Sequence, residues 1–343
     1  MTRIEGAHVL VTGGAGFIGS HLVDALLDAD VASVTVVDNL ATGSRANLEN
    51  ALLDPRVRFL ELDARDIDAM GEALDDVDVV FHLACLGVRH SLHDPRENHE
   101  VNATLTLNLL ELARHRGVAR FVHVSSSEVY GSAQYAPMDE GHPTFPETVY
   151  GAAKLAGEAY ARAAYRTYGF PVTVVRPFNA YGPRSHFEGD SGEVLPRTIV
   201  RVLAGEAPII YGDGEQSRDF THVTDTARAI IELARSHEAV GLTVNIGSGR
   251  DVTINELARL VSAAAGRTDL GVLRLDPRPG DVRRLLADSS LLYRLTGFAT
   301  RVPFDEGVQD LLERMRTAAA TPAEMLAQVA DRNWGVSVGA DRG

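Results

Sequence analysis

A glycine-rich turn near the N-terminus constrains the fold of this chain more than any other feature. An apolar run over residues 7–12 leads into a G-x-x-G-x-x-G sequence, and residues 17–27 then show helical spacing. Glycines at this spacing allow a tight turn and let the backbone approach a pyrophosphate, whose charge the helix N-terminus binds. The strand before and the helix after make this a predicted dinucleotide site. The residues assigned to it are Gly13, Gly16, Phe17, Ile18 and Gly19.

An acidic residue at the end of the next predicted strand indicates which dinucleotide binds. Asp38 lies about 20 residues beyond the glycines, where a carboxylate accepts hydrogen bonds from the ribose hydroxyls and repels a 2′-phosphate. Asn39 beside it carries no positive charge, although Arg45 is close in sequence. The predicted cofactor is therefore NAD rather than NADP. Asp63 follows the third predicted strand, either to meet the adenine or as an ordinary loop residue.

Short apolar runs alternate with helical patterns along the chain, which predicts an α/β Rossmann fold. Buried strands read as continuous apolar runs, and the alternation implies a doubly wound parallel sheet with helices on both faces. After residue 176, glycine, proline and aspartate become frequent and the elements shorten, which predicts a smaller C-terminal lobe partly interleaved with the first. The predicted divisions are an NAD-binding domain at 1–176, mainly a substrate lobe at 177–316, and a frayed tail at 317–343.

The predicted elements are strands at 7–12, 31–37, 57–62, 77–83, 121–125, 172–176, 207–211, 243–246 and 272–275, and helices at 17–27, 103–116, 150–168, 224–236 and 255–265.

Composition excludes several functional classes. The 33 basic and 47 acidic side chains leave a net charge of −14, which should repel nucleic acid and anionic lipid. No apolar run approaches the roughly 20 residues of a membrane span, and no leader precedes the first strand, so we expect a cytoplasmic protein. Cys85 is the single cysteine, which excludes an internal disulfide and predicts a small buried apolar residue. The histidines show no metal-ligand spacing, so no metal is expected.

A tyrosine and a lysine four residues apart indicate a general base. Tyr150 and Lys154 fall on one face of the predicted helix 150–168, because residues i and i+4 of a helix are neighbours. The lysine ammonium would lower the pKa of the tyrosine, so that a phenolate could act as a base near neutral pH. Three serines at 125–127 end a strand of the same unit, where hydroxyls can hold the substrate oxygen.

Several motifs together resemble the extended short-chain dehydrogenases/reductases that act on nucleotide sugars. They are TGGAGFIGSH, FHLA, SSSEVYG, YGAAK, RPFNAYGPR, GDGEQSRDFTHVTD and RPGDV, and the resemblance covers residues 7–316. It implies an NAD-dependent enzyme with a nucleotide-sugar substrate, most simply a UDP-sugar. It also implies a homodimer in which residues 103–116 and the helix carrying Tyr150 form a four-helix bundle with the partner.

The resemblance assigns a role to each matched residue. The implied catalytic triad is Ser126, Tyr150 and Lys154, and Lys154 would also reach the nicotinamide ribose. The implied contacts to the substrate nucleotide and diphosphate are Asn179, Arg184, Arg218, Arg278 and Asp281. For Arg184, as for Arg89, a solvated surface ion pair is an equal alternative. His82 and His123 lie in predicted strands and are interpreted as packed core residues.

The residues at 127 and 128 bear on which reaction follows oxidation of the sugar at C4. The 4,6-dehydratases carry Asp-Glu there, whereas this chain has Ser127 and Glu128, which argues against dehydration. The run SEVYG resembles the UDP-glucuronic acid decarboxylases (UDP-xylose synthases), in which these side chains could reprotonate C5. Decarboxylation is thus the first expectation and 4-epimerisation of UDP-glucose or UDP-glucuronic acid the alternative. His186 stands where uronic-acid epimerases often carry arginine. A non-catalytic NAD-binding protein is a distant third.

Overall fold

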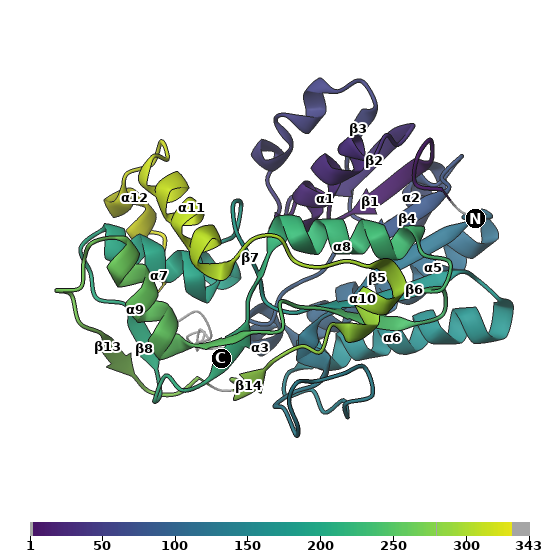
Figure 1. Cartoon of the computed structure of the whole chain (residues 1–343). Coiled ribbons are helices and arrows are strands. Elements are labelled where there is room, and N and C mark those ends of the chain that lie inside the picture. Colours follow the sequence, from purple (N-terminus) through teal and green to yellow (C-terminus); the bar gives the residue numbers. More distant parts are fainter. Residues whose placement is uncertain (1–2, 279, 331–343) are drawn as a thin grey trace, which may run out of the picture.

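The computed structural model describes residues 3–278 and 280–330, and a seven-stranded parallel sheet forms its centre (Figure 1). Every pair of neighbouring strands in this sheet is parallel, so the predicted Rossmann fold is confirmed. In spatial order the strands are β11 (Thr243–Ile246), β6 (Val172–Pro177), β5 (Arg120–Val124), β4 (Val79–His82), β1 (His8–Thr12), β2 (Ser33–Asp38) and β3 (Val57–Glu61).

Helices cover both faces of this sheet and bury an apolar core on each. Along β1, Val9 and Val11 pack toward one layer and Leu10 toward the other, because successive strand residues point to opposite faces. The first layer contains α1 (Phe17–Asp28), α8 (Val223–Arg235) and α10 (Ser290–Thr296). The second contains α2 (Ile67–Ala73), α5 (Leu105–His115) and α6 (Val149–Tyr168).

The smaller lobe lies at one end of the sheet and has its own apolar core (Figure 1). Its helices are α7 (Val194–Leu203), α9 (Ile254–Ala264), α11 (Phe304–Arg316) and α12 (Pro322–Leu326). Its strands are β7 (Ala180–Tyr181), β8 (Ile209–Tyr211), β9 (Ser217–Asp219), β10 (Thr221–His222), β12 (Asp251–Thr253), β13 (Leu273–Leu275) and β14 (Arg284–Leu285). The two lobes are interleaved in sequence. Helix α8 and strand β11 lie between segments of the smaller lobe but belong to the first domain, where β11 pairs with β6.

The start of the predicted tail differs from the expectation of a frayed segment. Thr321 caps α12 through a reciprocal pair of bonds with Glu324, and Met325 is buried in the core of the smaller lobe. Leu326 packs against the same core, but a five-residue helix is too short to show a periodic pattern in the sequence. The rest of the predicted tail, residues 331–343, lies outside the described residues.

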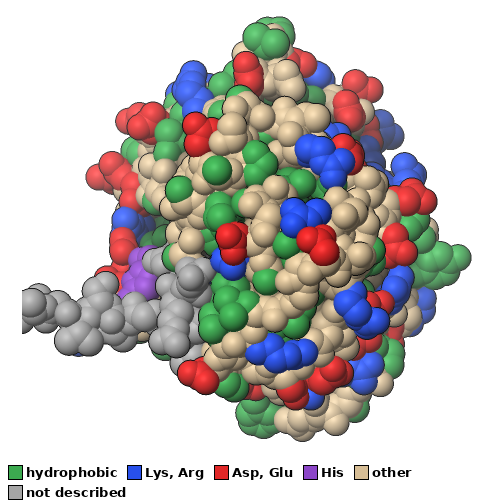
Figure 2. Space-filling view, turned by 90° about the vertical axis from the view of Figure 1, so that its left-hand side faces the viewer, with side chains coloured by type: hydrophobic (Ala, Val, Ile, Leu, Met, Phe, Trp, Pro, Cys, Tyr) green, Lys and Arg blue, Asp and Glu red, His purple; other side chains and the backbone are tan. Residues whose placement is uncertain are grey.

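The surface mixes charges of both signs. On the face shown in Figure 2, acidic and basic side chains are interspersed with apolar ones. Over residues 3–278 and 280–330, no helix combines the length and apolar character needed to cross a membrane.

Candidate active site

One pocket lies between the two lobes, at the carboxyl ends of the parallel strands, where α/β proteins of this topology bind ligands. It brings together every residue predicted for the site except Arg184. The predicted residues in its wall are Gly13, Gly16, Phe17, Ile18, Gly19, Asp38, Asn39, Asp63, Ser126, Ser127, Glu128, Tyr150, Lys154, Asn179, Arg218, Arg278 and Asp281.

The glycine turn leaves no room for side chains at two positions. Gly13 has φ +68°, and a Cβ there would lie 2.6 Å from the backbone nitrogen of Ala84. A Cβ on Gly19 would overlap the carbonyl oxygen of Gly13. Gly16 precedes α1 as its N-cap and supplies no side-chain cap, and Phe17, Ile18 and Gly19 of the first turn line the pocket. This geometry fits a pyrophosphate bound on backbone amides.

Asp38 is positioned by the turn that it faces. Its carboxylate accepts hydrogen bonds from the backbone of Ala15 at 2.9 Å and of Leu40 at 2.8 Å. Burial raises the pKa of Asp38, and these amide donors oppose the rise. Arg45 is the basic residue near Asp38 in sequence that could have favoured NADP. It lies over the ring of Phe59, 5.0 Å from its centroid, and is absent from the pocket wall. The residues at this end of the pocket therefore fit NAD.

Asp63 also lies in the pocket wall, held by a partner that the sequence did not indicate. Arg65 binds its carboxylate at 2.7 Å, and the side-chain amide of Asn39 donates to it at 3.2 Å. The bond from Arg65 lowers the pKa of Asp63 to about 2. Contact between Asp63 and the adenine remains a prediction.

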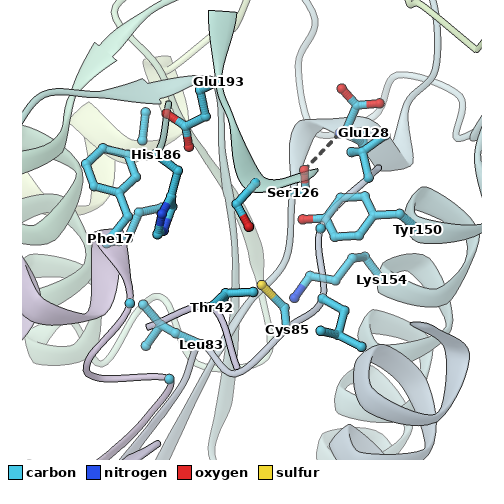
Figure 3. A pocket seen from close by; sticks show the side chains of 18 of the residues that line it. Phe17, Thr42, Leu83, Cys85, Ser126, Glu128, Tyr150, Lys154, His186 and Glu193 are labelled. Atoms are coloured by element: carbon cyan, nitrogen blue, oxygen red, sulfur yellow. Dashed lines mark hydrogen bonds between the residues drawn. The ribbon is translucent and has the colours of Figure 1, made fainter. Parts of the chain in front are cut away.

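The residues predicted to be catalytic converge from two neighbouring elements. Tyr150 and Lys154 lie on α6, whose first turn Thr148 caps by accepting a bond from the backbone of Gly151 at 3.1 Å. Ser126 follows β5, and its side chain lies near the phenol of Tyr150 in the pocket wall. Figure 3 shows these three side chains on one side of the pocket, with the side chain of Cys85 beside them.

The electrostatics of this group differ in one respect from the prediction. Burial raises the pKa of Tyr150, and the Ser126 side chain beside it opposes the rise. The ammonium of Lys154, expected to lower it, instead donates to the carbonyl oxygen of Val124 at 2.6 Å. Burial also lowers the pKa of Lys154 itself.

Ser127 and Glu128 start a 3₁₀ turn, η4 (Ser127–Val129), next to this group. Ser126 caps the turn by accepting a bond from the backbone of Glu128 at 3.2 Å (Figure 3). Both side chains reach the pocket. Burial raises the pKa of Glu128, although Arg218 and Arg89 oppose the rise. Glu128 therefore has the environment of a carboxylic acid that can give up a proton to a ligand.

Arginines gather on the side of the pocket formed by the smaller lobe. Arg218 of β9 forms an ion pair with Asp281 at 2.7 Å, and Arg278 lies over the ring of Tyr211, 4.4 Å from its centroid. Arg89 also lines the pocket. This local positive charge explains how a chain of net charge −14 can bind an anionic ligand.

Arg184 lies outside this pocket, contrary to the implied substrate contact. Its guanidinium forms an ion pair with Asp24 of α1 at 2.8 Å, and its φ is +67°. The neighbouring Pro183 carbonyl accepts a bond from His21 of the same helix at 2.9 Å. These bonds fasten the start of the 182–193 loop to the helix that begins at the glycine turn.

The structure also shows the environments of the single cysteine and of two histidines that the sequence interpreted as core residues. Cys85 is exposed and lines the pocket, so the prediction of a buried residue was wrong. The residue follows the carboxyl end of β4, where the pocket lies. His82 and His123 are buried core residues, as predicted, and their rings stack 5.6 Å apart. In the part of the chain that the structure describes, no group of three His, Cys, Asp or Glu residues could hold a metal ion.

Glu193 was missed by the sequence interpretation. It begins α7 and lines the pocket on the wall opposite Tyr150, near His186 and Phe17 (Figure 3). Burial raises the pKa of Glu193 to about 8, with His186 opposing the rise. A single glutamate before a helix matches no sequence motif. Its place in the pocket depends on the path of the preceding loop, which the sequence does not indicate.

These features define an NAD-binding protein of the short-chain dehydrogenase/reductase type: a Rossmann sheet whose glycine turn and acidic Asp38 share one pocket with a Tyr–Lys pair. Comparison with known proteins makes the assignment specific. The NAD dependent epimerase/dehydratase family matches residues 9–247, and the chain belongs to this family. NAD is thereby confirmed as the cofactor of its class.

Two relatives represent the activities within the family. A putative UDP-glucose 4-epimerase of Methanocaldococcus jannaschii is 36% identical over 313 residues, covering 90% of this chain and 98% of that protein. UDP-glucuronic acid decarboxylase 1 of Xenopus tropicalis is 33% identical over 314 residues, covering 90% of this chain and 72% of that protein.

Solved structures show the same architecture. A UDP-N-acetylglucosamine 4-epimerase from Methanobrevibacter ruminantium, in complex with UDP-N-acetylmuramic acid, matches with TM-score 0.84 at 36% identity, over 90% of this chain and 98% of that one. A dTDP-glucose 4,6-dehydratase from Streptomyces venezuelae with NAD bound matches with TM-score 0.86 at 34% identity, over 90% and 97%.

Proposed function

We propose that this protein is an NAD-dependent UDP-sugar 4-epimerase. The observation that carries the proposal is that Tyr150, Ser126 and Lys154 meet at one point of the pocket that also contains the glycine turn and Arg218. A sugar 4-hydroxyl bound at that point would lie beside the phenol oxygen of Tyr150 for proton transfer, with the Ser126 hydroxyl holding the sugar oxygen. Arg218 and Arg278 suit the diphosphate.

The residues of the chain supply proton transfer and orientation. Bound NAD supplies the redox chemistry, accepting the hydride from C4 and giving it back. Tyr150 holds the proton removed from the 4-hydroxyl and returns it when the 4-keto sugar is reduced, so proton and hydride are both restored. Inversion then requires only that the keto sugar present its other face. No further acid is needed for this reaction.

Dehydration at C5 and C6 has weaker support. Ser127 stands where the dehydratases resembled by this chain carry an aspartate that protonates the departing 6-hydroxyl. A neutral serine hydroxyl is a much poorer proton donor than a carboxylic acid. The site therefore supports oxidation and reduction at C4 without loss of water.

Decarboxylation of UDP-glucuronic acid is the second candidate, and Glu128 favours it. A 4-ketone makes the C5 carboxylate a β-keto acid, so that carbon dioxide leaves and C5 must then take up a proton. Glu128 lines the pocket beside Tyr150, and its raised pKa suits it to donate that proton. The sequence placed this reaction first. We place it second because epimerisation explains the site without Glu128, and because 4-epimerases are among both the curated relatives and the solved structures similar to this chain.

Product analysis tests the proposal directly. The purified protein is incubated separately with UDP-glucose, UDP-N-acetylglucosamine and UDP-glucuronic acid, and the products are separated and weighed. Epimerisation predicts an unchanged mass with a new retention time. Loss of the mass of carbon dioxide from UDP-glucuronic acid would instead establish decarboxylation. Failure to convert any of the three would overturn the proposal and leave a non-catalytic NAD-binding protein.

A further inference from the structure

Three side chains of α6 lie against the end of β5. Tyr150, Lys154 and Glu158 are spaced four residues apart, so they share one face of the helix. Tyr150 lies beside Ser126, and Lys154 donates to the Val124 carbonyl at 2.6 Å. The third contact is a 2.6 Å bond from the hydroxyl of Ser125 to the carboxylate of Glu158. The three side chains therefore lie against three consecutive residues, namely Val124 at the end of β5 and Ser125 and Ser126 directly after it.

Glu158 is held far more firmly than a surface ion pair. Its side chain is 0% exposed, and Arg176 of β6 binds it through two bonds of 2.8 and 2.6 Å. Arg162 adds a third cationic bond at 3.0 Å. The guanidinium of Arg176 is itself fixed over the ring of Tyr130, 4.6 Å from its centroid. A buried carboxylate survives only when so paired, and the two-bond geometry makes its position specific.

The charge of the Glu158 carboxylate also affects the pKa of Lys154. Burial lowers the pKa of Lys154, and the charge of Cys85 and, after it, that of Glu158 oppose this shift. The other titratable groups that interact with Lys154 are Cys85, which follows β4, His82 of β4 and His123 of β5. Both histidines are neutral because burial lowers the pKa of each, so Glu158 is the buried anion of this set.

We propose that Glu158 is a positioning residue for the catalytic pair. Its bonds to Arg176 and Ser125 fix the rotation and depth of α6 against the end of β5, and its charge keeps Lys154 protonated. This inference rests on the proposed function only in taking Tyr150 and Lys154 as the catalytic pair. It holds equally for a 4-epimerase and for a decarboxylase, since both begin with oxidation at C4.

Two variants separate positioning from a merely structural role. Glu158→Gln leaves Arg176 buried without its anion, which can prevent folding. The double variant Glu158→Met/Arg176→Met replaces the whole pair by apolar side chains of similar length, a change that buried ion pairs often tolerate. We expect the double variant to fold and to bind NAD with unchanged affinity. Its kcat should fall about 10- to 100-fold, because small displacements of catalytic groups carry costs of this size.

Two readouts test positioning beyond turnover. Loss of the carboxylate lowers the pKa of Lys154, so the alkaline limb of the pH–rate profile should move to lower pH by about one unit. Hydrogen exchange of the amides in the first two turns of α6 should become faster in the double variant without substrate. The matched control is Glu232→Gln, which removes a partly exposed ion pair with Arg235 on α8 and should change neither readout.

The inference is overturned if the folded double variant keeps the wild-type kcat, pH profile and exchange rates. It is also overturned if kcat falls while the pH profile and the exchange of α6 stay unchanged. Failure of the proposed function is distinguishable, because a wild type that converts no nucleotide sugar would still show the exchange difference on α6.

Discussion

At the scale of single residues, Tyr150 has the environment that a proton-transfer group requires. It is buried, lies beside Ser126, and lines the pocket that also contains the glycine turn. We predict that Tyr150→Phe lowers kcat by about 10²- to 10⁴-fold, the usual contribution of general acid–base catalysis. NAD affinity, measured by calorimetry, should be unchanged, since the hydroxyl is the only atom removed. Turnover near the wild-type rate would exclude Tyr150 as the base.

Glu128 separates the two candidate reactions. In Glu128→Gln the side chain keeps its shape but loses the acidic proton. For an epimerase we predict a kcat within a few-fold of wild type, because no step at C4 uses this proton. For a decarboxylase, formation of the C5-protonated product should fall about 100-fold. Chromatography of the products with each substrate measures both, and an equal loss of both reactions would contradict this division of roles.

The residues that sequence reasoning placed correctly are those defined by local spacing. Gly13, Gly19 and Asp38 belong to one strand–helix–strand unit, β1–α1–β2, so their meeting in a pocket follows from the chain's own path. Arg184 and Glu193 have positions decided by long-range contacts: Arg184 meets Asp24 of α1, and Glu193 is carried to the pocket by a loop. No spacing rule predicts such partners from one sequence.

At the scale of elements, the strands of the central sheet lie within two residues of their predicted bounds, since buried parallel strands are continuous apolar runs. The two- and three-residue strands of the smaller lobe are too short to show alternation, and several were missed. The helix predicted at 103–116 instead follows a π-helical turn, Glu100–Thr104. Within it, Asn102 exchanges bonds with the backbone of Leu86 at 2.9 and 3.3 Å, a tertiary contact that overrides local preference.

The start of α7 should make stability depend on pH. Glu193 has a pKa raised from 4.5 to about 8, so the folded state binds its proton more tightly than the unfolded chain. Its contribution to stability is full below about pH 4.5 and is lost as the pH rises through about 8. We predict that Glu193→Gln raises the melting temperature by a few degrees at about pH 9 and leaves it unchanged at about pH 5.

Thermal unfolding followed by circular dichroism measures this difference. Glu238→Gln, at an exposed position, is the control and should show no such pH dependence. An equal effect of Glu193→Gln at both pH values would contradict a buried proton on Glu193.

At the scale of the whole molecule, we predict a homodimer formed through the outer face of α6. Ala152, Ala159 and Ala163 are exposed along this helix, and Tyr168 near its end is 61% exposed. Small side chains allow close approach of a second helix, and aromatic ones add apolar contact area. Light scattering should give twice the chain mass for the wild type and a single chain mass for Ala159→Arg. Ala119→Arg, at an exposed alanine elsewhere, should remain dimeric. A monomeric wild type would contradict the prediction.

The central claim, that hydrogen leaves C4 and returns to it within one enclosed site, is tested most directly by isotope labelling. UDP-glucose carrying deuterium at C4 is converted by the enzyme, and the position of the label in the product is determined by NMR. We predict that the product retains deuterium at C4 and that kcat is lower than with unlabelled substrate. A product formed with solvent hydrogen at C4 would contradict the account.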